Sequence, residues 1–136
     1  MKRTELFFPF EPKAKGRPRF TRTGHTYTPQ ITRDYEKQIG DFYKENTSDY
    51  YDSPIKVSLV FYMPIPKNTS KKKMELMKSG AIRHTKKPDS DNLAKAVLDG
   101  INGVAFEDDK LITELRIKKR YGSVVGTAMV ITEDVD

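Results

Sequence analysis

Apolar residues along this chain recur at two different spacings, and a spacing of two residues predicts strands. Alternating apolar positions indicate an edge strand at residues 5–10 and a second strand at 113–121, whose other face is cationic. A run rich in β-branched and aromatic residues, bounded by prolines, predicts a central strand at 55–63. The apolar segment at 124–132 adds a fourth strand.

A spacing of three to four residues predicts three helices. The first runs from a cap at Thr28 or Thr32 to about Glu45, with an apolar stripe that begins at Ile31. This stripe could pack inward or across subunits. A short basic helix at 70–77 ends at a glycine, and a third helix over 91–102 closes on Asn-Gly. The second and third helices lie between the central strand and the strand at 113–121.

The order of these elements and the length of the chain favour one small domain. We expect an α/β (α+β) fold over residues 1–136, with a mixed β-sheet flanked by helices, because 136 residues supply one hydrophobic core. The chain has no cysteine, which excludes disulfide frameworks and thiol chemistry. No apolar run approaches the about 20 residues of a membrane-spanning helix. We therefore expect a soluble, cytoplasmic protein that does not contact a membrane.

The positive charge is concentrated in two segments. The net charge is +6, and residues 1–33 carry eight Lys or Arg against two Glu, while residues 67–95 carry nine against three acids. The extended basic loop at 12–29, with a hairpin turn predicted at Thr23-Gly24, is longer than an ordinary connection. This distribution favours a polyanionic partner such as nucleic acid.

The most informative segment joins a helix start to an acidic turn. Two aspartates straddle the start of the predicted third helix, and a lysine and another aspartate follow at four-residue intervals on one side. A pair of aspartates comes ten residues later, before a strand that returns alongside the helix. Three or four carboxylates are thus expected to converge, and such hard oxygen ligands suit Mg²⁺ or Mn²⁺. The residues concerned are Asp89, Asp91, Lys95, Asp99, Asp108 and Asp109.

Each of these residues also has an ordinary structural interpretation. Asp89 or Asp91 could cap the helix and interact with its dipole. Asp91 and Lys95 could form an exposed ion pair worth about 0.2–0.5 kcal/mol, and Asp108-Asp109 could be a simple turn. Under these interpretations, which stay open at the level of sequence, the chain is a non-catalytic nucleic-acid-binding module.

The same residues resemble a known family, the RusA-type Holliday-junction resolvases that are common in prophages. The family pattern Asp-x-Asp-Asn-x-x-Lys-Ala-x-x-Asp is matched from Asp89 to Asp99, and its Asp-Asp turn is matched by Asp108-Asp109. The family's basic N-terminal loop is echoed by Gly16-Arg17-Pro18-Arg19-Phe20. The resemblance spans most of residues 5–131.

The resemblance implies a homodimeric, metal-dependent endodeoxyribonuclease that nicks four-way junctions symmetrically in DNA recombination and repair. It assigns the metal to Asp89, Asp91 and one of the paired aspartates, with Asp109 preferred to Asp108, and it makes Lys95 the catalytic lysine. The ion would be Mg²⁺, with Mn²⁺ as an alternative. The lysine-rich segment at 67–83 departs from the family core, so a flap- or fork-specific nuclease with the same site stays open.

The residue types agree with phosphodiester hydrolysis. A divalent ion relieves charge on phosphate oxygens and activates water, and a lysine near the site can stabilise the transition state. Phe20 and Tyr27 are expected either to stack on bases or wedge at the branch point, or to be ordinary core or hairpin residues. The cations expected to hold the DNA backbone are Arg17, Arg19, Arg22, Lys86, Lys87, Lys118 and Arg120.

Overall fold

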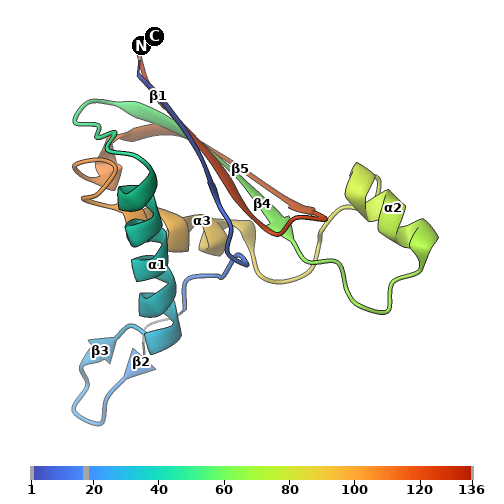
Figure 1. Ribbon diagram of the computed structural model, residues 1–136. Coiled ribbons are helices and arrows are strands. Elements are labelled where there is room, and N and C mark those ends of the chain that lie inside the picture. Colours follow the sequence, from blue (N-terminus) through green and yellow to red (C-terminus); the bar gives the residue numbers. More distant parts are fainter. Residues whose placement is uncertain (1, 17–18, 136) are drawn as a thin grey trace.

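A four-stranded mixed β-sheet lies at the centre of the molecule (Figure 1), as the sequence predicted. The structure, a computed structural model, describes residues 2–16 and 19–135, and for Arg19 the backbone alone. The strands, in spatial order, are β1 (Arg3–Phe8), β6 (Gly126–Glu133), β4 (Ile55–Met63) and β5 (Ile112–Tyr121). The β4–β5 pair is parallel and the other two pairs are antiparallel.

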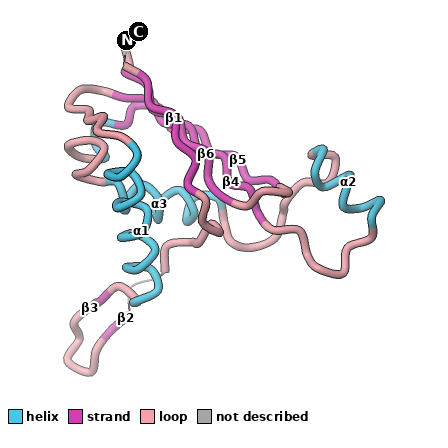
Figure 2. The backbone as a smooth tube through the Cα atoms, in the orientation of Figure 1, coloured by secondary structure: helices cyan, strands magenta, loops and turns pink. Residues whose placement is uncertain are grey.

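Two of the three helices cover one face of this sheet. Helices α1 (Gln30–Asn46) and α3 (Ser90–Ile101) pack side by side, whereas α2 (Lys71–Ser79) stands apart from them at one end of the sheet (Figure 2). A short hairpin of β2 (Arg19–Phe20) and β3 (Thr26–Tyr27) extends from the start of α1 (Figure 1). Within the described chain, no helix is long and apolar enough to cross a membrane.

Alternation along β4 explains how the sheet and the two helices share a core. Every second residue of β4 is buried, and Leu59 and Phe61 are fully inaccessible to solvent. They pack with Ile39 of α1 and Val97 of α3. The residues of β4 between them point to the opposite sheet face and are only partly buried.

Helices α1 and α3 cross at a contact that requires two glycines. A Cβ atom on Gly40 would lie 2.7 Å from the carbonyl oxygen of Gly100. A Cβ atom on Gly100 would lie 2.9 Å from the carbonyl oxygen of Glu36. Since real Cβ atoms need more room than this, glycine at both positions allows the backbones to touch. The close crossing brings the polar residues that border it, Glu36 and Asp99, to one place.

The start of α1 differs from the prediction. Pro29, rather than Thr28 or Thr32, occupies the N-cap position. Thr32 is buried, and its hydroxyl accepts a hydrogen bond from the Gly16 N–H instead. Ile31, the first residue of the predicted apolar stripe, is 63% exposed. The first turn of α1 lies beside the projecting hairpin, so this position of the apolar stripe has no core to pack against (Figure 1).

Candidate active site

A pocket of about 210 Å³ lies between α3 and the edge strand β5. It brings together residues from three elements that are separate in sequence, including the short 3₁₀ turn η1 (Asp109–Leu111) that precedes β5. Its lining combines apolar side chains with three carboxylates and an ammonium group. The lining residues are Asp91, Ala94, Lys95, Leu98, Asp99, Asp109, Leu115 and Ile117.

Helix periodicity and strand alternation explain this composition. Asp91, Lys95 and Asp99 are four residues apart and therefore follow one side of α3. Leu115 and Ile117 belong to the face of β5 that packs toward the helices. The acidic turn ends where β5 begins, so it delivers an aspartate to the same pocket, as the sequence predicted for a strand returning alongside the helix.

The two aspartates of the acidic turn have different surroundings. Asp109 lines the pocket and is exposed. Asp108 occupies the N-cap of η1, and its carboxylate accepts a hydrogen bond from the Lys110 N–H at 3.4 Å. The turn interpretation therefore describes Asp108, while Asp109 lines the same pocket as Asp91.

The aspartates at the start of α3 are both exposed to solvent. Asp89 occupies the N-cap position, and its carbonyl oxygen accepts a hydrogen bond from the Leu93 N–H at 3.1 Å. Its carboxylate receives no cap hydrogen bond from the described residues of the helix. The Asp91 carboxylate accepts only the local bond from the Asn92 N–H, at 3.0 Å, among the contacts of the described chain. Capping thus leaves both carboxylates available to a ligand.

The segment before α3 is fastened by a lysine from β5. The Lys119 ammonium donates hydrogen bonds to the carbonyl oxygens of Lys86 at 2.6 Å and Pro88 at 2.8 Å. Lys119 lies on the helix-facing side of β5, where alternation otherwise places apolar residues. These bonds hold the chain directly before Asp89.

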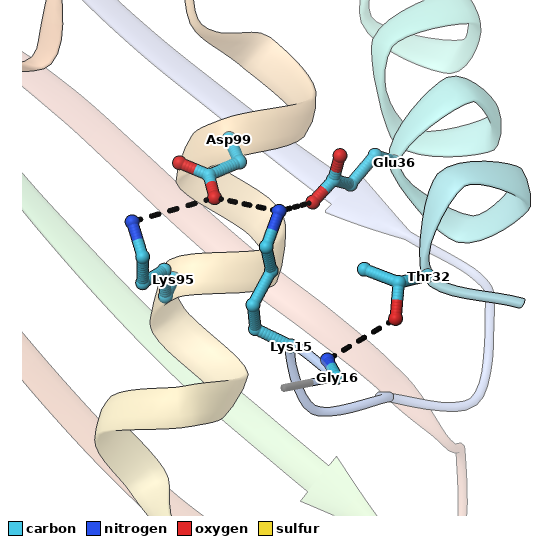
Figure 3. A network of polar contacts seen from close by, with 6 residues as sticks. All are labelled: Lys15, Gly16, Thr32, Glu36, Lys95 and Asp99. Carbon is cyan, nitrogen blue, oxygen red and sulfur yellow. Dashed lines mark hydrogen bonds and ion pairs between the residues drawn. The ribbon is translucent and has the colours of Figure 1, made fainter. Parts of the chain in front are cut away.

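A four-residue ionic network borders the pocket at the other end of α3 (Figure 3). The Lys95 ammonium lies 3.4 Å from Oδ2 of Asp99, so the lysine pairs with Asp99 rather than with Asp91 as the ion-pair interpretation expected. The Lys15 ammonium lies 3.1 Å from the same oxygen and also donates to the Glu36 carboxylate. Lys15, Glu36 and Asp99 are each about one-fifth exposed, whereas Lys95 is 60% exposed.

The surroundings of Lys15 keep it charged. Burial alone would lower its pKa, but hydrogen bonds and charge interactions with Glu36 and Asp99 outweigh burial, and the pKa is raised above its ordinary value. Lys15 is therefore an ammonium ion throughout the neutral range, and the two partly buried carboxylates around it share its charge.

The backbone around Lys15 fixes the basic loop to the helices. The Lys15 N–H donates to the carbonyl oxygen of Asn92 at 3.0 Å, and the Gly16 N–H donates to Oγ1 of Thr32 at 3.1 Å. A Cβ atom at residue 16 would lie 2.6 Å from that hydroxyl, so glycine permits the close approach. The loop that carries the cationic motif therefore starts at the surface of α3.

The predicted DNA-binding cations fall into three groups. Arg22 is exposed on the β2–β3 hairpin, and Lys86 and Lys87 are exposed just before α3. Lys118 and Arg120 alternate with the pocket-lining residues of β5 and so lie on the opposite sheet face. Arg17 and the side chain of Arg19 lie outside the described residues.

The two aromatic residues of the hairpin are at the surface. Phe20 is 74% exposed and Tyr27 is 47% exposed, so neither belongs to the core, and both lie in the β2–β3 hairpin, as the hairpin interpretation expected. Apolar rings on a cationic hairpin are suited to contact with bases.

The pocket offers the donor chemistry that a hard divalent cation prefers. Within residues 2–16 and 19–135, no three His, Cys, Asp or Glu side chains are close enough to hold a metal ion by themselves. Mg²⁺ is commonly held by one or two carboxylates, with water and substrate phosphate as the other ligands. Asp91 and Asp109, exposed on one pocket, meet that smaller requirement.

Three residues of this region were not singled out from the sequence. Glu36 lies one helical turn from both Thr32 and Gly40, which are buried. An acid on the same side of a helix as buried residues is unusual, and this position could have drawn attention to it. Lys119 falls on the apolar side of the β5 alternation, which is a second signal. Lys15 carries no local signal, because its importance depends on where the loop lies.

Comparisons with known proteins agree with this arrangement. The chain is 31% identical over 129 residues to a Bacillus subtilis (strain 168) protein named "Uncharacterized protein YqaN", a match covering 90% of this chain and 91% of that protein. The family model described as "Endodeoxyribonuclease RusA" matches residues 9–132, which include the basic loop, both helices of the site and the acidic turn. Of the residues of the family pattern, Asp91, Lys95, Asp99 and Asp109 line the pocket, whereas Asp89 and Asp108 are not among its lining residues. With nearly its whole length matched, this chain belongs to the RusA family of endodeoxyribonucleases.

Proposed function

We propose that this protein is a metal-dependent endodeoxyribonuclease that resolves four-way DNA junctions by paired, symmetric nicks, in recombination and repair in the cytoplasm. The observation that carries the proposal is the pocket that unites Asp91, Lys95 and Asp109 in a member of an endodeoxyribonuclease family. Family membership implies action on Holliday junctions. Carboxylates beside an ammonium group are suited to the hydrolysis of a phosphodiester in particular.

In this mechanism the exposed aspartates hold the metal. Asp91 and Asp109 would ligate Mg²⁺, or Mn²⁺ in its place, and Asp89 would contribute from the start of α3, with Asp108 as the alternative to Asp109. The ion supplies charge relief at the phosphate and an activated water. With such an ion bound, these carboxylates would hold the scissile phosphate next to α3, since substrate phosphate commonly completes the ligand set of Mg²⁺.

Lys95 acts on the phosphate from one helical turn away. It lines the pocket and is 60% exposed, and Asp99 restrains its ammonium group at 3.4 Å. A positive charge at this position would stabilise the negative charge that develops on the phosphate oxygens during attack. Electrostatic stabilisation of this kind requires a charge held in place before the reaction, and the ion pair with Asp99 provides that restraint.

The DNA would lie along the helix-bearing side of the molecule, between the hairpin and the start of α3. Arg17, Arg19 and Arg22 of the basic loop are proposed to bind phosphates, together with Lys86 and Lys87 before α3. Phe20 and Tyr27 would stack on bases at the branch point. Lys118 and Arg120, on the opposite sheet face, are assigned to a different arm of the junction.

A homodimer follows from the symmetry of the proposed substrate. A four-way junction has paired strands of the same polarity, and a two-fold dimer presents two equivalent sites to them. Each nick would then be made by one copy of the pocket described above.

A flap- or fork-specific nuclease is the second candidate, and the position of α2 is the observation that favours it. This helix has exposed lysines at 71–73 and projects from the end of the sheet (Figure 1), so it adds a cationic surface outside the helix-covered face. The same pocket would carry out the chemistry. A non-catalytic binding module is the alternative in which the carboxylates serve only the fold.

One experiment separates these functions. A labelled synthetic four-way junction, a linear duplex and a flap are incubated with wild type, Asp91→Asn and the matched exposed control Asp52→Asn, in Mg²⁺, Mn²⁺ or EDTA. The proposal expects paired nicks in the junction that need metal, persist in the control and disappear in Asp91→Asn. Cutting confined to the flap would establish the second candidate. Binding without cutting in either metal would establish the binding module.

A further inference from the structure

We propose that Lys15 is a positioning residue for Lys95 and acts on it through Asp99. This inference rests on the proposed nuclease function and assigns a role to a residue of the basic loop that touches neither of the exposed pocket aspartates in the described contacts. Lys15 sets how much of the Asp99 charge is available to Lys95, and so how freely Lys95 interacts with a phosphate.

The geometry shows one carboxylate oxygen shared by two ammonium groups (Figure 3). Oδ2 of Asp99 lies 3.1 Å from Nζ of Lys15 and 3.4 Å from Nζ of Lys95. The two lysines approach this oxygen from different elements, since Lys95 belongs to α3 and Lys15 to the loop that crosses it. The shorter contact is the one made by the more buried lysine.

Lys15 is held in place independently of its interaction with Asp99. Its backbone N–H is bonded to the Asn92 carbonyl, and its ammonium group also donates to Glu36. Glu36 in turn is placed by the close crossing of α1 and α3 at Gly40 and Gly100. Lys15 is therefore held by several contacts, whereas the ammonium group of the more exposed Lys95 has an ion pair only with Asp99 among the described contacts.

The consequence for Lys95 follows from charge. With Lys15 in place, the negative charge of Asp99 is divided between two partners, and Lys95 is restrained without being fully neutralised. Without the Lys15 charge, Asp99 would interact with Lys95 alone and draw it away from the phosphate, while Glu36 and Asp99 would repel each other. The expected defect is thus in the chemical step rather than in DNA binding.

The test measures single-turnover cleavage of the four-way junction at saturating wild-type or variant protein, together with junction affinity. Lys15→Met should lower the cleavage rate about tenfold, equivalent to about 1.4 kcal/mol of transition-state stabilisation, with affinity changed less than about threefold. Lys15→Arg should restore most of the rate, because it returns the charge. Lys37→Met, which removes an exposed ion pair from α1, is the matched control and should cleave at the wild-type rate.

A double-mutant cycle with Asp99→Asn separates positioning from general support of the fold. If Lys15 acts through Asp99, adding Lys15→Met to Asp99→Asn should change the rate less than about twofold. An undiminished loss in that background would overturn the inference. If Lys15→Met unfolds, Lys15→Met/Glu36→Gln removes the unpaired acid, and its cleavage rate is compared with that of Glu36→Gln.

The outcomes distinguish this inference from the proposed function. A wild-type protein that cuts the junction while Lys15→Met cuts equally well overturns the role of Lys15 and leaves the nuclease in place. A wild-type protein that cuts no junction in Mg²⁺ or Mn²⁺ overturns both.

Discussion

The two ends of the polar side of α3 carry carboxylates in opposite circumstances. At the N-terminal end, Asp89 and Asp91 are exposed, and the described residues place no cation in an ion pair with either. At the C-terminal end, Asp99 is about one-fifth exposed and is paired with both Lys15 and Lys95. We call the first the exposed end of α3, because its carboxylates have no ion pair among the described contacts. We call the second the paired end, because its carboxylate is paired with lysines of the protein.

This difference indicates which carboxylates serve the fold and which serve a ligand. A partly buried acid needs partners within the protein, because desolvation penalises its charged form. An exposed acid without a cation pays no such penalty and can accept a metal ion. Asp109 resembles Asp91 in this respect, since it is exposed on the same pocket. The predictions below test this division, from the largest expected effect to the smallest.

Removing a charge at the exposed end should abolish the chemistry and spare the fold. Asp91→Asn and Asp109→Asn should each lower metal-dependent cleavage by about 10³-fold or more, because a metal ligand is lost. The free energy of unfolding should change by less than about 0.5 kcal/mol, as expected for exposed positions. Cleavage assays and urea titrations measure the two quantities. Normal cleavage by both variants would remove these carboxylates from the metal site.

Forcing α1 and α3 apart at their crossing should destabilise the protein around the ionic network of Asp99. Gly40→Ala places a Cβ atom 2.7 Å from the Gly100 carbonyl oxygen, and overpacking of this kind costs about 1–3 kcal/mol even though alanine favours the helix. Thermal unfolding should show the loss, and Gln38→Ala on the exposed side of α1 is the control. An unchanged melting temperature would mean that the crossing is looser than the structure indicates.

Removing the charge at the paired end should affect both activity and stability, moderately. Asp99→Asn frees Lys95 from its restraint and should lower the cleavage rate about tenfold. It also deprives Lys15 of one partner, which should cost about 1 kcal/mol of unfolding free energy. The combination contrasts with Asp91→Asn, where activity alone is lost. Loss of stability with full activity would show that Asp99 serves the fold only.

A cation beside the exposed end should affect binding by a small and predictable amount. Lys87→Ala should weaken junction binding a few-fold, reducing the slope of log affinity against log salt by about 1, since one phosphate contact is removed. The single-turnover rate at saturating protein should be unchanged. Lys44→Ala, an exposed lysine at the end of α1, should leave the slope as it is in the wild type. Equal slopes for Lys87→Ala and wild type would place the DNA elsewhere.

Much of the fold could be predicted from local sequence. Alternation at 113–121 and the apolar run at 55–63 predicted β5 and β4, and the stripe at 91–102 predicted α3. The exposed Ile31 shows where this reasoning failed, because periodicity marks a helix face but not how far the core extends along it.

The candidate site could also be predicted in part from local spacing. The spacing of Asp91, Lys95 and Asp99 along one helix guarantees a shared side, whatever the rest of the chain does. Which member of the acidic turn faces that side depends on the conformation of η1, where Asp108 caps and Asp109 lines the pocket. The ion-pair interpretation chose Asp91 for Lys95, but Asp99 also lies one turn away, and local spacing does not decide between the two partners.

The sequence by itself therefore determined the elements, the family resemblance and the set of acids and cations from which a site could be built, because these depend on short-range spacing and residue chemistry. The tertiary structure decided the rest. Lys15 and Glu36 are 21 residues apart, and both are distant in sequence from Asp99, yet the three meet where two glycines let α1 and α3 touch. Charge balance around a carboxylate is a property of everything packed against it, and local sequence does not contain that information.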